Sequence, residues 1–403
     1  MIQYGKFGIA SAIAAGILSL SGAGNLTPAP ALESITDPST TSAPLIPLGE
    51  WPASLTVTDD LLADWQPTDR APLLTAIEFS LQYLDTPAAF EAYANYPIEG
   101  ITRDRVRQSL LRFRTLLQTS TSAAAFQSAV QQEFVTYQAA GYDGAGTVHF
   151  TAYFEPSFQA SRVPTEDYRY PLYRRPPTLE TWSEPHPTRR ALEGVDGLQG
   201  SQGPLQGLEL VWLKDRLSAF LVQVQGSAKL QLTSGGFMSV GYAGRTEYEY
   251  TSIGRELIND GKIPASELTL DRLLEHFQAY PEELDVYLPR NDRFVFFRET
   301  SGGPPTGTFS VPVTAARSIA TDKSLMPPGA IALMMLDWPE RRSASTWQNR
   351  PISRYVLNQD TGGAIQGAGR VDIFVGTGDE AGAQAGQVNT DGRVFYLLLR
   401  PRE

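Results

Sequence analysis

The sequence predicts a mainly β protein with a helical N-terminal part, and three observations lead to this class. Helical periodicity dominates from about residue 71 to residue 140. After Gly141 the chain changes to short runs of β-branched and aromatic residues, separated by glycine and proline clusters. No internal repeat interrupts this pattern. Together these features favour a barrel over a parallel sheet covered by helices.

The helical part follows residues 27–49, which are rich in proline, serine and threonine and are typical of a flexible linker. An apolar stripe along one helix face is formed by Val106, Leu110, Phe113 and Leu117. Residues 119–122 offer N-cap side chains for a further helix. We expect that helix to carry Phe126, Val130, Phe134 and Tyr137.

The remainder predicts strands, interrupted by an irregular proline-rich segment at 162–189 and a helical passage at 252–280. The β-prone run at 148–154 ends at Glu155-Pro156, and this proline predicts an exposed strand end for Glu155. Further strands are expected near residues 208–213, 218–225, 228–233, 293–298, 309–313, 330–336, 353–357, 371–375 and 393–399.

Composition excludes several classes of protein. The net charge of −11 argues against a nucleic-acid partner, because phosphate binding needs a basic surface. The absence of cysteine excludes disulfides, thiol catalysis and cysteine-ligated zinc. The three histidines (His149, His186 and His276) are far apart in sequence, so we expect no metal site and no cofactor.

The N-terminus has the order of a secretory signal, with Lys6, then the apolar residues 7–20, then small residues 21–24. The apolar run is shorter than the roughly twenty residues that a spanning helix needs. We therefore expect an exported chain with residues 1–24 as a signal peptide and residues 25–50 as a linker. The alternative is an uncleaved N-terminal anchor.

Two aspartates near the C-terminus are the first candidates for chemistry. Asp360 opens a glycine turn, and Asp372 interrupts the apolar run at 371–375. Burial among apolar neighbours raises the pKa of a carboxyl group, which then can serve as a general acid. The alternative is an aspartate that caps a turn or pairs with Arg370 or Arg393. Asp360-Thr-Gly could also belong to an aspartic protease, but such an enzyme needs a second triplet that this chain lacks.

Three other segments could contact a ligand. The first is 151–156, where Thr151 and Tyr153 could contact sugar hydroxyls and rings, although aromatic residues on a strand usually serve core packing. Gln223 and Gln225 would share one face of a strand, for cross-strand hydrogen bonds or for sugar recognition. Gly241 and Gly244 flank Tyr242, where the backbone could approach a ligand closely.

In this order, the segments resemble the membrane-bound lytic murein transglycosylase A family. The matching stretches are Phe150-Thr-Ala-Tyr-Phe-Glu-Pro, Tyr168-Arg-Tyr-Pro-Leu-Tyr, Gln223-Val-Gln-Gly-Ser, Val240-Gly-Tyr-Ala-Gly, Tyr250-Thr-Ser-Ile-Gly-Arg, Asn291-Asp-Arg-Phe-Val-Phe-Phe, and the run from Asp360 to Gly378. The C-terminal part also resembles the "three-aspartate" domain, whose carboxylates match Asp322, Asp360 and Asp372. The resemblance covers about residues 140–400.

The resemblance implies a double-psi β-barrel with an inserted second β domain. The barrel domain would comprise residues 51–156, with the helical part, together with residues 291–403. The inserted domain would comprise residues 157–290 and form the other wall of a groove that holds a glycan strand.

The resemblance also implies a reaction, the non-hydrolytic cleavage of the β-1,4 bond between N-acetylmuramic acid and N-acetylglucosamine in peptidoglycan, which leaves a 1,6-anhydro ring. Asp372 matches the family's catalytic aspartate and would act first as acid and then as base. Asp360 would shape the site and its charge. The expected substrate contacts are Thr151, Tyr153, Gln225, Gly226, Tyr242, Gly244 and Asp322.

One departure concerns location. Family members are often lipoproteins anchored through a cysteine, and this chain has none. We therefore expect a periplasmic or envelope enzyme that is not a lipoprotein, with peptidoglycan glycan strands as its partner, and peripheral membrane or cell-wall assembly partners remain open. Two other functions remain as alternatives, a glycoside hydrolase with Glu155 as the second carboxylate and a non-catalytic peptidoglycan-binding protein.

Overall fold

The computed structural model describes residues 43–48, 51–52, 59–300, 302–343 and 346–401. The predicted signal peptide and the alternative N-terminal anchor lie outside the described residues. The predicted linker, residues 25–50, is described only at 43–48. Among the helices of the described part, none has the length and apolar character needed to cross a bilayer.

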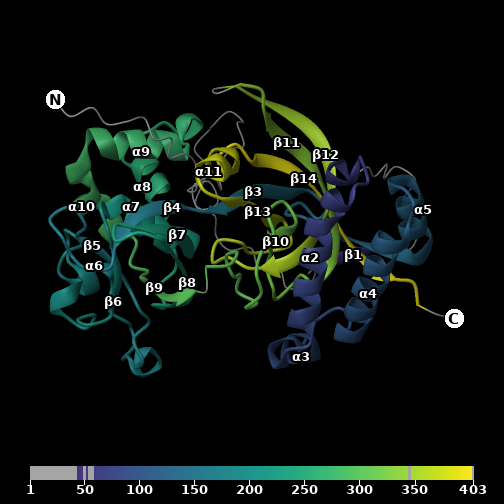
Figure 1. Ribbon diagram of the computed structural model, residues 1–403, viewed down its shortest axis with the longest axis horizontal. Coiled ribbons are helices and arrows are strands. Elements are labelled where there is room, and N and C mark those ends of the chain that lie inside the picture. Colours follow the sequence, from purple (N-terminus) through teal and green to yellow (C-terminus); the bar gives the residue numbers. More distant parts are fainter. Residues whose placement is uncertain (1–42, 49–50, 53–58, 301, 344–345, 402–403) are drawn as a thin grey trace, which may run out of the picture.

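The protein is mainly β, as the sequence predicts, and its strands form two sheets (Figure 1). The first sheet has eight strands: β1 (Leu45–Pro47), β2 (Phe134–Ala139), β3 (Val148–Glu155), β10 (Ser318–Ala320), β11 (Ile331–Arg341), β12 (Trp347–Asp360), β13 (Arg370–Thr377) and β14 (Asn389–Leu399). The second has six: β4 (Ser157–Ser161), β5 (Tyr170–Tyr173), β6 (Glu209–Leu213), β7 (Ser227–Leu232), β8 (Phe237–Arg245) and β9 (Val295–Thr300).

The first sheet closes into a six-stranded barrel. Its strand order is β1-β2-β14-β11-β12-β10-β13-β3, and β14 pairs with β3 as well as with β11. The closed ring therefore contains β3, β13, β10, β12, β11 and β14. The pairs β10–β12 and β13–β3 are parallel, and the other pairs of the ring are antiparallel. Closure removes the unpaired edges that an open sheet would expose.

The second sheet has the order β5-β6-β4-β7-β8-β9. Its two edge strands approach each other, because the backbone of Arg174, next to β5, bridges to Phe297 in β9. Buried apolar side chains of this sheet form a core separate from that of the barrel. β9 lies after the segment 157–290 that the resemblance assigns to the inserted domain.

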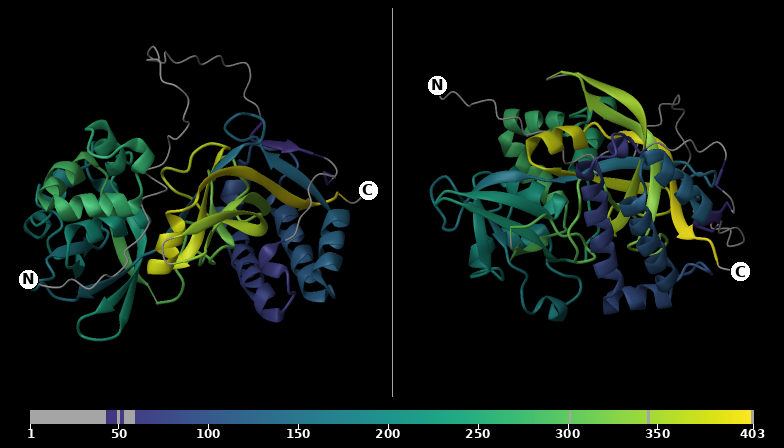
Figure 2. Two further views of the ribbon diagram at one scale, coloured as in Figure 1. Left: turned by 90° about the horizontal axis from the view of Figure 1, so that it is seen from above. Right: turned by 45° about the vertical axis from the view of Figure 1, so that its right-hand side comes forward.

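Helices flank the two sheets in separate groups (Figures 1 and 2). On the barrel side lie α2 (Pro67–Leu84), α3 (Pro87–Ala94), α4 (Arg103–Thr119) and α5 (Ala123–Glu133). With the second sheet lie α6 (Arg189–Glu193), α7 (Arg216–Gln225), α8 (Ile253–Asn259), α9 (Leu270–Ala279) and α10 (Leu284–Tyr287). α11 (Asp379–Ala385) follows β13. Single 3₁₀ turns occur at Asp60–Leu62, Leu179–Thr181, Gly200–Gln202, Ala265–Glu267, Pro281–Glu283 and Leu288–Arg290.

The predicted apolar stripe lies on α4 and is buried. Thr102 caps this helix by accepting a hydrogen bond from the main-chain N–H of Arg105 at 3.2 Å. The side chains of Val106, Leu110, Phe113 and Leu117 are all at most 1% exposed. Full burial of such side chains stabilises a fold by about 1.5–3 kcal/mol each.

The helix predicted through Tyr137 ends earlier than expected. Ser122 caps α5, as the sequence indicates, through a 3.1 Å bond from Ala125 N–H. The chain leaves the helix after Glu133, and Phe134 and Tyr137 lie on β2, which pairs with β1 and β14. The pairing in the sheet overrides the local helical spacing, because it depends on strands distant in sequence.

The strand predicted at 218–225 is wrong, because these residues form helix α7. Asp215 caps the helix through a 2.7 Å bond from Ser218 N–H, and Gly226 ends it in the left-handed conformation with φ 77°. Gln223 and Gln225 therefore do not share a strand face. Apolar residues at helical spacing in this segment, Leu217, Phe220, Leu221 and Val224, carried the correct signal.

The strand predicted at 309–313 is also wrong. Only an isolated bridge joins Thr306 to Pro312, and between them the chain turns back with Ser310 at φ 61°. The main-chain N–H of Gly307 bonds to Val311 O within this turn. The apolar residues Phe309, Val311 and Val313 are buried all the same, so a short apolar run was mistaken for a strand.

A prediction about stability arises at the seam where the barrel closes. Gly392 in β14 pairs with Leu336 of β11 and with Val148 of β3. A Cβ added at this position would overlap Met335 O and lie 2.8 Å from a Phe150 ring carbon. We expect Gly392→Ala to lower the free energy of unfolding by about 1–3 kcal/mol, measured by urea denaturation.

The matched control is Gly203→Ala, because a Cβ there would meet no atom within 4 Å and the φ of Gly203 is −127°. The control is expected to unfold at the wild-type urea concentration. Equal stability of the two variants would contradict tight packing at the seam.

Candidate active site

Four strands of the barrel bring the candidate residues into one row. Asp372 in β13 pairs with Thr151 in β3 on one side and with Ala320 in β10 on the other. Ala320 in turn pairs with Asp360 at the end of β12. Asp360 and Asp372 are therefore two strand spacings apart, roughly 10 Å between Cα atoms. The small side chain of Ala320 leaves space between the two carboxyl groups.

Asp372 is a buried carboxyl group with one hydrogen bond from a side chain. It is 5% exposed, and Thr151 Oγ1 donates to its Oδ1 at 2.8 Å. Arg370 Nη2 donates to the same threonine hydroxyl at 3.3 Å. Burial raises the pKa of Asp372 to about 6, an effect that the Thr151 bond and the charge of Arg370 oppose and the charge of Asp360 supports.

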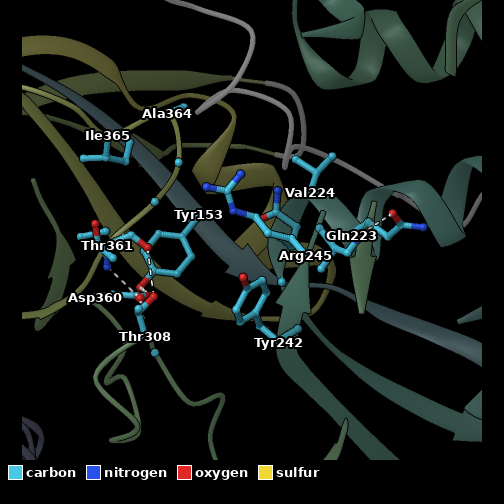
Figure 3. Close-up of a pocket in the computed structure, with 18 of the residues that line it drawn as sticks. Tyr153, Gln223, Val224, Tyr242, Arg245, Thr308, Asp360, Thr361, Ala364 and Ile365 are labelled. Carbon is cyan, nitrogen blue, oxygen red and sulfur yellow. Dashed lines mark hydrogen bonds between the residues drawn. The ribbon is translucent and has the colours of Figure 1, made fainter. Parts of the chain in front are cut away.

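Asp360 accepts hydrogen bonds from three donors (Figure 3). Its Oδ1 accepts from the main-chain N–H groups of Thr308 at 2.7 Å and Thr361 at 2.8 Å. Its Oδ2 accepts from the hydroxyl of Tyr153 at 2.8 Å. Three hydrogen bonds of this kind hold the Asp360 side chain in one orientation.

Both aspartates line a cavity of about 640 Å³ that the barrel and the second sheet form together. A cavity of this size is typical of a small-molecule or substrate site. Figure 3 shows Asp360, Thr308, Thr361 and Tyr153 on one side and Gln223, Val224 and Tyr242 on the other, with the Arg245 side chain extending into the space between them. Within the described residues, Asp360 and Asp372 are the two acidic side chains of the lining.

Cations outnumber these acids in the lining, which is notable for a chain of net charge −11. The basic lining residues are Arg189, Arg245, Arg293, Arg298 and Lys323. Across the part of the chain that the structure describes, no cluster of histidine and acidic side chains could hold a metal ion. The site is thus built from two aspartates, hydroxyl groups, amides and guanidinium groups.

The structure brings six of the nine predicted site residues to the cavity. The lining contains Asp372, Asp360, Tyr153, Gln225, Gly226 and Tyr242. Thr151 is fully buried behind Asp372, so its contact is with the carboxyl group. Gly244 lies between two lining residues, and a Cβ there would come 2.9 Å from Arg175 Cδ.

Asp322 lies beside the lining. Its Oδ2 accepts from Gly367 N–H at 2.8 Å and its Oδ1 accepts from Ser324 N–H at 3.0 Å. Partial burial raises the pKa of Asp322, but the hydrogen bond that the Ser324 hydroxyl donates at 2.6 Å and the two main-chain bonds outweigh burial, so that the pKa lies below its ordinary value. The carboxylate thereby holds the loop 361–369 that follows Asp360. Of the three matched aspartates, Asp360 and Asp372 line the cavity and Asp322 does not.

The sequence predicted that Glu155 is exposed, but this residue is buried, with 3% of its surface accessible. It ends β3, as expected, but its Oε2 accepts a 2.9 Å bond from Thr377 Oγ1 and burial raises its pKa. The proline after it ends the strand, while α11 packs over the same region. Glu155 is not part of the cavity lining.

Sequence reasoning missed the arginines and the turn donors of the site. Arg245 follows the Gly241-Tyr-Ala-Gly244 segment, and Arg293 lies within the matched Asn291 stretch, but neither had a spacing that marked it. Thr308 directly precedes the segment 309–313 that was predicted as a strand, and no sequence pattern marked it. Its main-chain N–H became a candidate donor only when the turn at 307–310 was seen next to Asp360.

Fold and site together define a barrel protein with a buried carboxyl group in the wall of a cavity that the barrel shares with a second β sheet. The comparisons with known proteins agree. A model described as the MltA specific insert domain matches residues 149–298, and a model described as the 3D domain matches residues 317–398.

Membrane-bound lytic murein transglycosylase A of Escherichia coli (strain K12) is 30% identical over 268 residues, covering 66% of this chain and 69% of that protein. The protein of the same name from Vibrio cholerae is 30% identical over 291 residues, covering 70% and 73%. The chain belongs to the membrane-bound lytic murein transglycosylase A family.

Solved structures agree with this assignment. The E. coli MltA structure with bound chitohexaose has a TM-score of 0.68 at 25% identity, covering 89% of this chain and 96% of that chain. The membrane-bound lytic murein transglycosylase of Agrobacterium tumefaciens has a TM-score of 0.66 at 26% identity, covering 80% and 92%.

Proposed function

We propose that this protein is a lytic transglycosylase that cleaves the β-1,4 bond between N-acetylmuramic acid and N-acetylglucosamine in peptidoglycan and leaves 1,6-anhydromuramic acid ends. The observation that carries the proposal is Asp372, a buried carboxyl group with a pKa of about 6 in the wall of a cavity. Such a group is protonated in part near neutral pH and can donate a proton.

The reaction needs one carboxyl group acting twice. Protonated Asp372 transfers its proton to the glycosidic oxygen as the bond to C1 of the muramyl residue breaks. The carboxylate that remains then accepts the proton of the muramyl C6 hydroxyl while that oxygen bonds to C1. Because the nucleophile belongs to the substrate, no water is consumed and Asp372 ends protonated again. This differs from hydrolysis, where a second carboxylate handles water or forms a covalent intermediate.

Thr151 and Asp360 support this cycle in different ways. The 2.8 Å bond from Thr151 fixes one oxygen of Asp372, so that Oδ2 is the atom available for proton transfer. The negative charge of Asp360 raises the pKa of Asp372 and would stabilise positive charge that develops on the sugar ring. Tyr153, Gln225, Gly226 and Tyr242 are proposed to contact the glycan from the cavity wall.

The hydrolase alternative is less well supported, because it needs a second carboxylate near the bond. Glu155 lies outside the cavity lining. Asp360 lies within it, but both of its oxygens already accept hydrogen bonds from Tyr153 and two main-chain N–H groups. The second alternative, a non-catalytic peptidoglycan-binding protein, is also disfavoured. Burial of a carboxyl group costs free energy, and a protein without activity would gain nothing in return.

The barrel is proposed to be of the double-psi type, which its two parallel pairs among antiparallel neighbours support. We keep the proposed division into a barrel domain, 51–156 with 291–403, and an inserted domain, 157–290, with the glycan strand between them. The pairing of β9 with β8 supports moving the second boundary to about residue 300. The name "membrane-bound" of the relatives supports a place in the cell envelope. Export to the periplasm is our proposal for this chain, and glycan strands are its proposed partner. E. coli MltA has been solved with chitohexaose, a glycan chain.

The test is mass spectrometry of the soluble products after the full chain is incubated with purified sacculi. We expect muropeptides with anhydro ends, which are lighter than the hydrolytic products by one water. Products with reducing ends would overturn the proposal in favour of hydrolysis. Sacculi that retain the protein without releasing any product would favour the binding protein.

A further inference from the structure

The basic residues of the cavity include two that are held side by side. The main-chain oxygen of Tyr248 accepts hydrogen bonds from Arg245 Nη1 at 3.0 Å and from Arg293 Nε at 2.8 Å. One acceptor thus fixes two guanidinium groups as neighbours at the wall of the cavity. The positive charges of two neighbouring guanidinium groups repel each other. An anion bound between them would therefore stabilise the arrangement.

The carboxylates of the described residues only partly balance this pair. Arg293 forms an ion pair with Glu249 at 3.3 Å, and the Glu249 side chain is 79% exposed. For Arg245 the described residues provide no ion pair with a carboxylate. Burial and the nearby charge of Arg245 lower the pKa of Arg293, as expected for two cations with too little opposite charge. Buried Arg189 also lines the cavity, but it is paired with Glu193 at 3.4 Å, so its charge is partly balanced.

A neutral donor without a partner lies at the same place. The Tyr250 hydroxyl is buried, and it has no hydrogen-bond partner in the part of the chain that the structure describes. Tyr250 lines the cavity, and its ring lies 6.0 Å from the Arg293 guanidinium carbon. A buried hydroxyl without a partner is costly, so a ligand oxygen that accepts its hydrogen bond would remove that cost.

A strand irregularity directs Arg245 into the cavity. The pairing of β8 with β9 shifts between Tyr242 and Gly244, so that β8 contains one extra residue. In a regular strand, residues three apart lie on opposite faces. The extra residue brings Tyr242 and Arg245 to the same cavity, where Figure 3 shows both. Such a local change of register is typical of binding sites.

We propose that Arg245, Arg293 and the Tyr250 hydroxyl bind a carboxylate carried by the muramyl residue of the glycan strand. This inference rests on the proposed function and names the part of the substrate that the second sheet recognises. Muramic acid differs from glucosamine by a lactyl ether, whose carboxyl group is either free or joined to a peptide that has carboxylates of its own. A planar guanidinium group matches the two oxygens of a carboxylate. Arg245 is then a specificity residue that separates peptidoglycan from a glycan without carboxylates.

The test measures the affinity of full-length protein for three probes, with Asp372→Asn present in every sample to prevent turnover. The probes are chitohexaose, which has no carboxylate, peptide-free strands with free lactyl groups, and peptide-bearing strands. Arg245→Gln is expected to weaken binding of a carboxylate-bearing strand about 10- to 100-fold. Binding of chitohexaose is expected to change less than about twofold, because that ligand has no charge to lose.

Arg174→Gln is the matched control. Arg174 donates from Nη1 to the main-chain oxygen of Glu209 at 2.8 Å, much as Arg245 does to Tyr248, but it lies outside the cavity lining. This control is expected to bind all three probes as the parent protein does. Arg245→Lys keeps the charge without the two-pronged geometry, and its binding is expected to fall between those of the parent and Arg245→Gln.

The pattern across probes identifies the source of the carboxylate. Weakening with peptide-free strands supports the lactyl group as the ligand, and weakening only with peptide-bearing strands supports the peptide. Equal weakening with chitohexaose, or no weakening with any strand, would overturn the inference. These outcomes are separate from failure of the proposed function, which would appear as the absence of anhydro products from the wild-type protein.

Discussion

Replacement of Asp372 by asparagine is expected to reduce the release of anhydro products from sacculi by at least about 10³-fold, in the upper part of the range for general acid–base catalysis. Asparagine has the same shape and can still accept the hydrogen bond that Thr151 donates at 2.8 Å. It cannot transfer a proton to the glycosidic oxygen or accept one from the C6 hydroxyl. Initial rates with sacculi, quantified by mass spectrometry, provide the measurement.

The unfolding of the same variant separates loss of chemistry from loss of structure. Burial raises the pKa of Asp372 from its ordinary value of 3.8 to about 6, so the folded state binds this proton more tightly than the unfolded state does. The wild-type protein therefore loses stability as pH rises from about 4 to above 6. Asp372→Asn lacks this loss and is expected to be more stable than wild type at pH 8 by up to about 3 kcal/mol, but not at pH 4.

Two outcomes would contradict the role of Asp372. Activity within tenfold of wild type would mean that another group donates the proton. A large loss of activity together with lower stability at pH 8 would mean that the carboxylate is needed for the structure, for example through Thr151 and Arg370.

Replacement of Asp360 by asparagine is expected to reduce activity about 10²-fold and also to change its pH dependence. Because Asp360 faces the same cavity, its replacement removes a carboxylate that would stabilise a positive sugar ring. Its charge also raises the pKa of Asp372. The rate of wild type should fall above about pH 6, where Asp372 loses its proton, and this fall should begin at a lower pH in Asp360→Asn. The measurement is the initial rate from pH 4 to pH 8.

The matched control for Asp360→Asn is Asp143→Asn. Asp143 also accepts two main-chain N–H bonds, from Ala145 at 2.9 Å and from Thr147 at 3.0 Å, but it is exposed and outside the cavity lining. Its variant is expected to keep the wild-type rate and pH profile. A profile for Asp360→Asn with the same upper limb as wild type would show that Asp360 does not act on the protonation of Asp372.

The apolar face of a long helix and the buried strands were the features most readily predicted from the sequence. The α4 stripe and the strands around residues 331–336, 371–375 and 393–399 follow from local periodicity, which depends on neighbours in the chain. The prediction was wrong in short segments where the apolar residues fit both the spacing of a helix and the spacing of a strand. At 218–225 the caps at Asp215 and Gly226 decide for a helix, and at 134–137 the pairing with β14 decides for a strand.

The buried carboxyl groups show the same difference between what local sequence predicts and what tertiary packing decides. Asp372 stood out because its neighbours are apolar, and its burial and raised pKa agree with that pattern. For Glu155, the proline after it predicted exposure, whereas packing around the end of β3 buries it. Local sequence indicates where a strand ends but not what covers the end.

The sequence by itself determined the mainly β class, the family resemblance and the identity of Asp360 and Asp372 as the carboxyl groups of interest, because each of these depends on short stretches of chain. The tertiary structure alone decided that Asp360, Ala320, Asp372 and Thr151 form one row across four strands. It also decided that Tyr248 holds Arg245 and Arg293 together at the facing wall. The physical reason is that strand pairing and side-chain contact join residues far apart in the chain, and no local pattern records which distant strand a segment will meet.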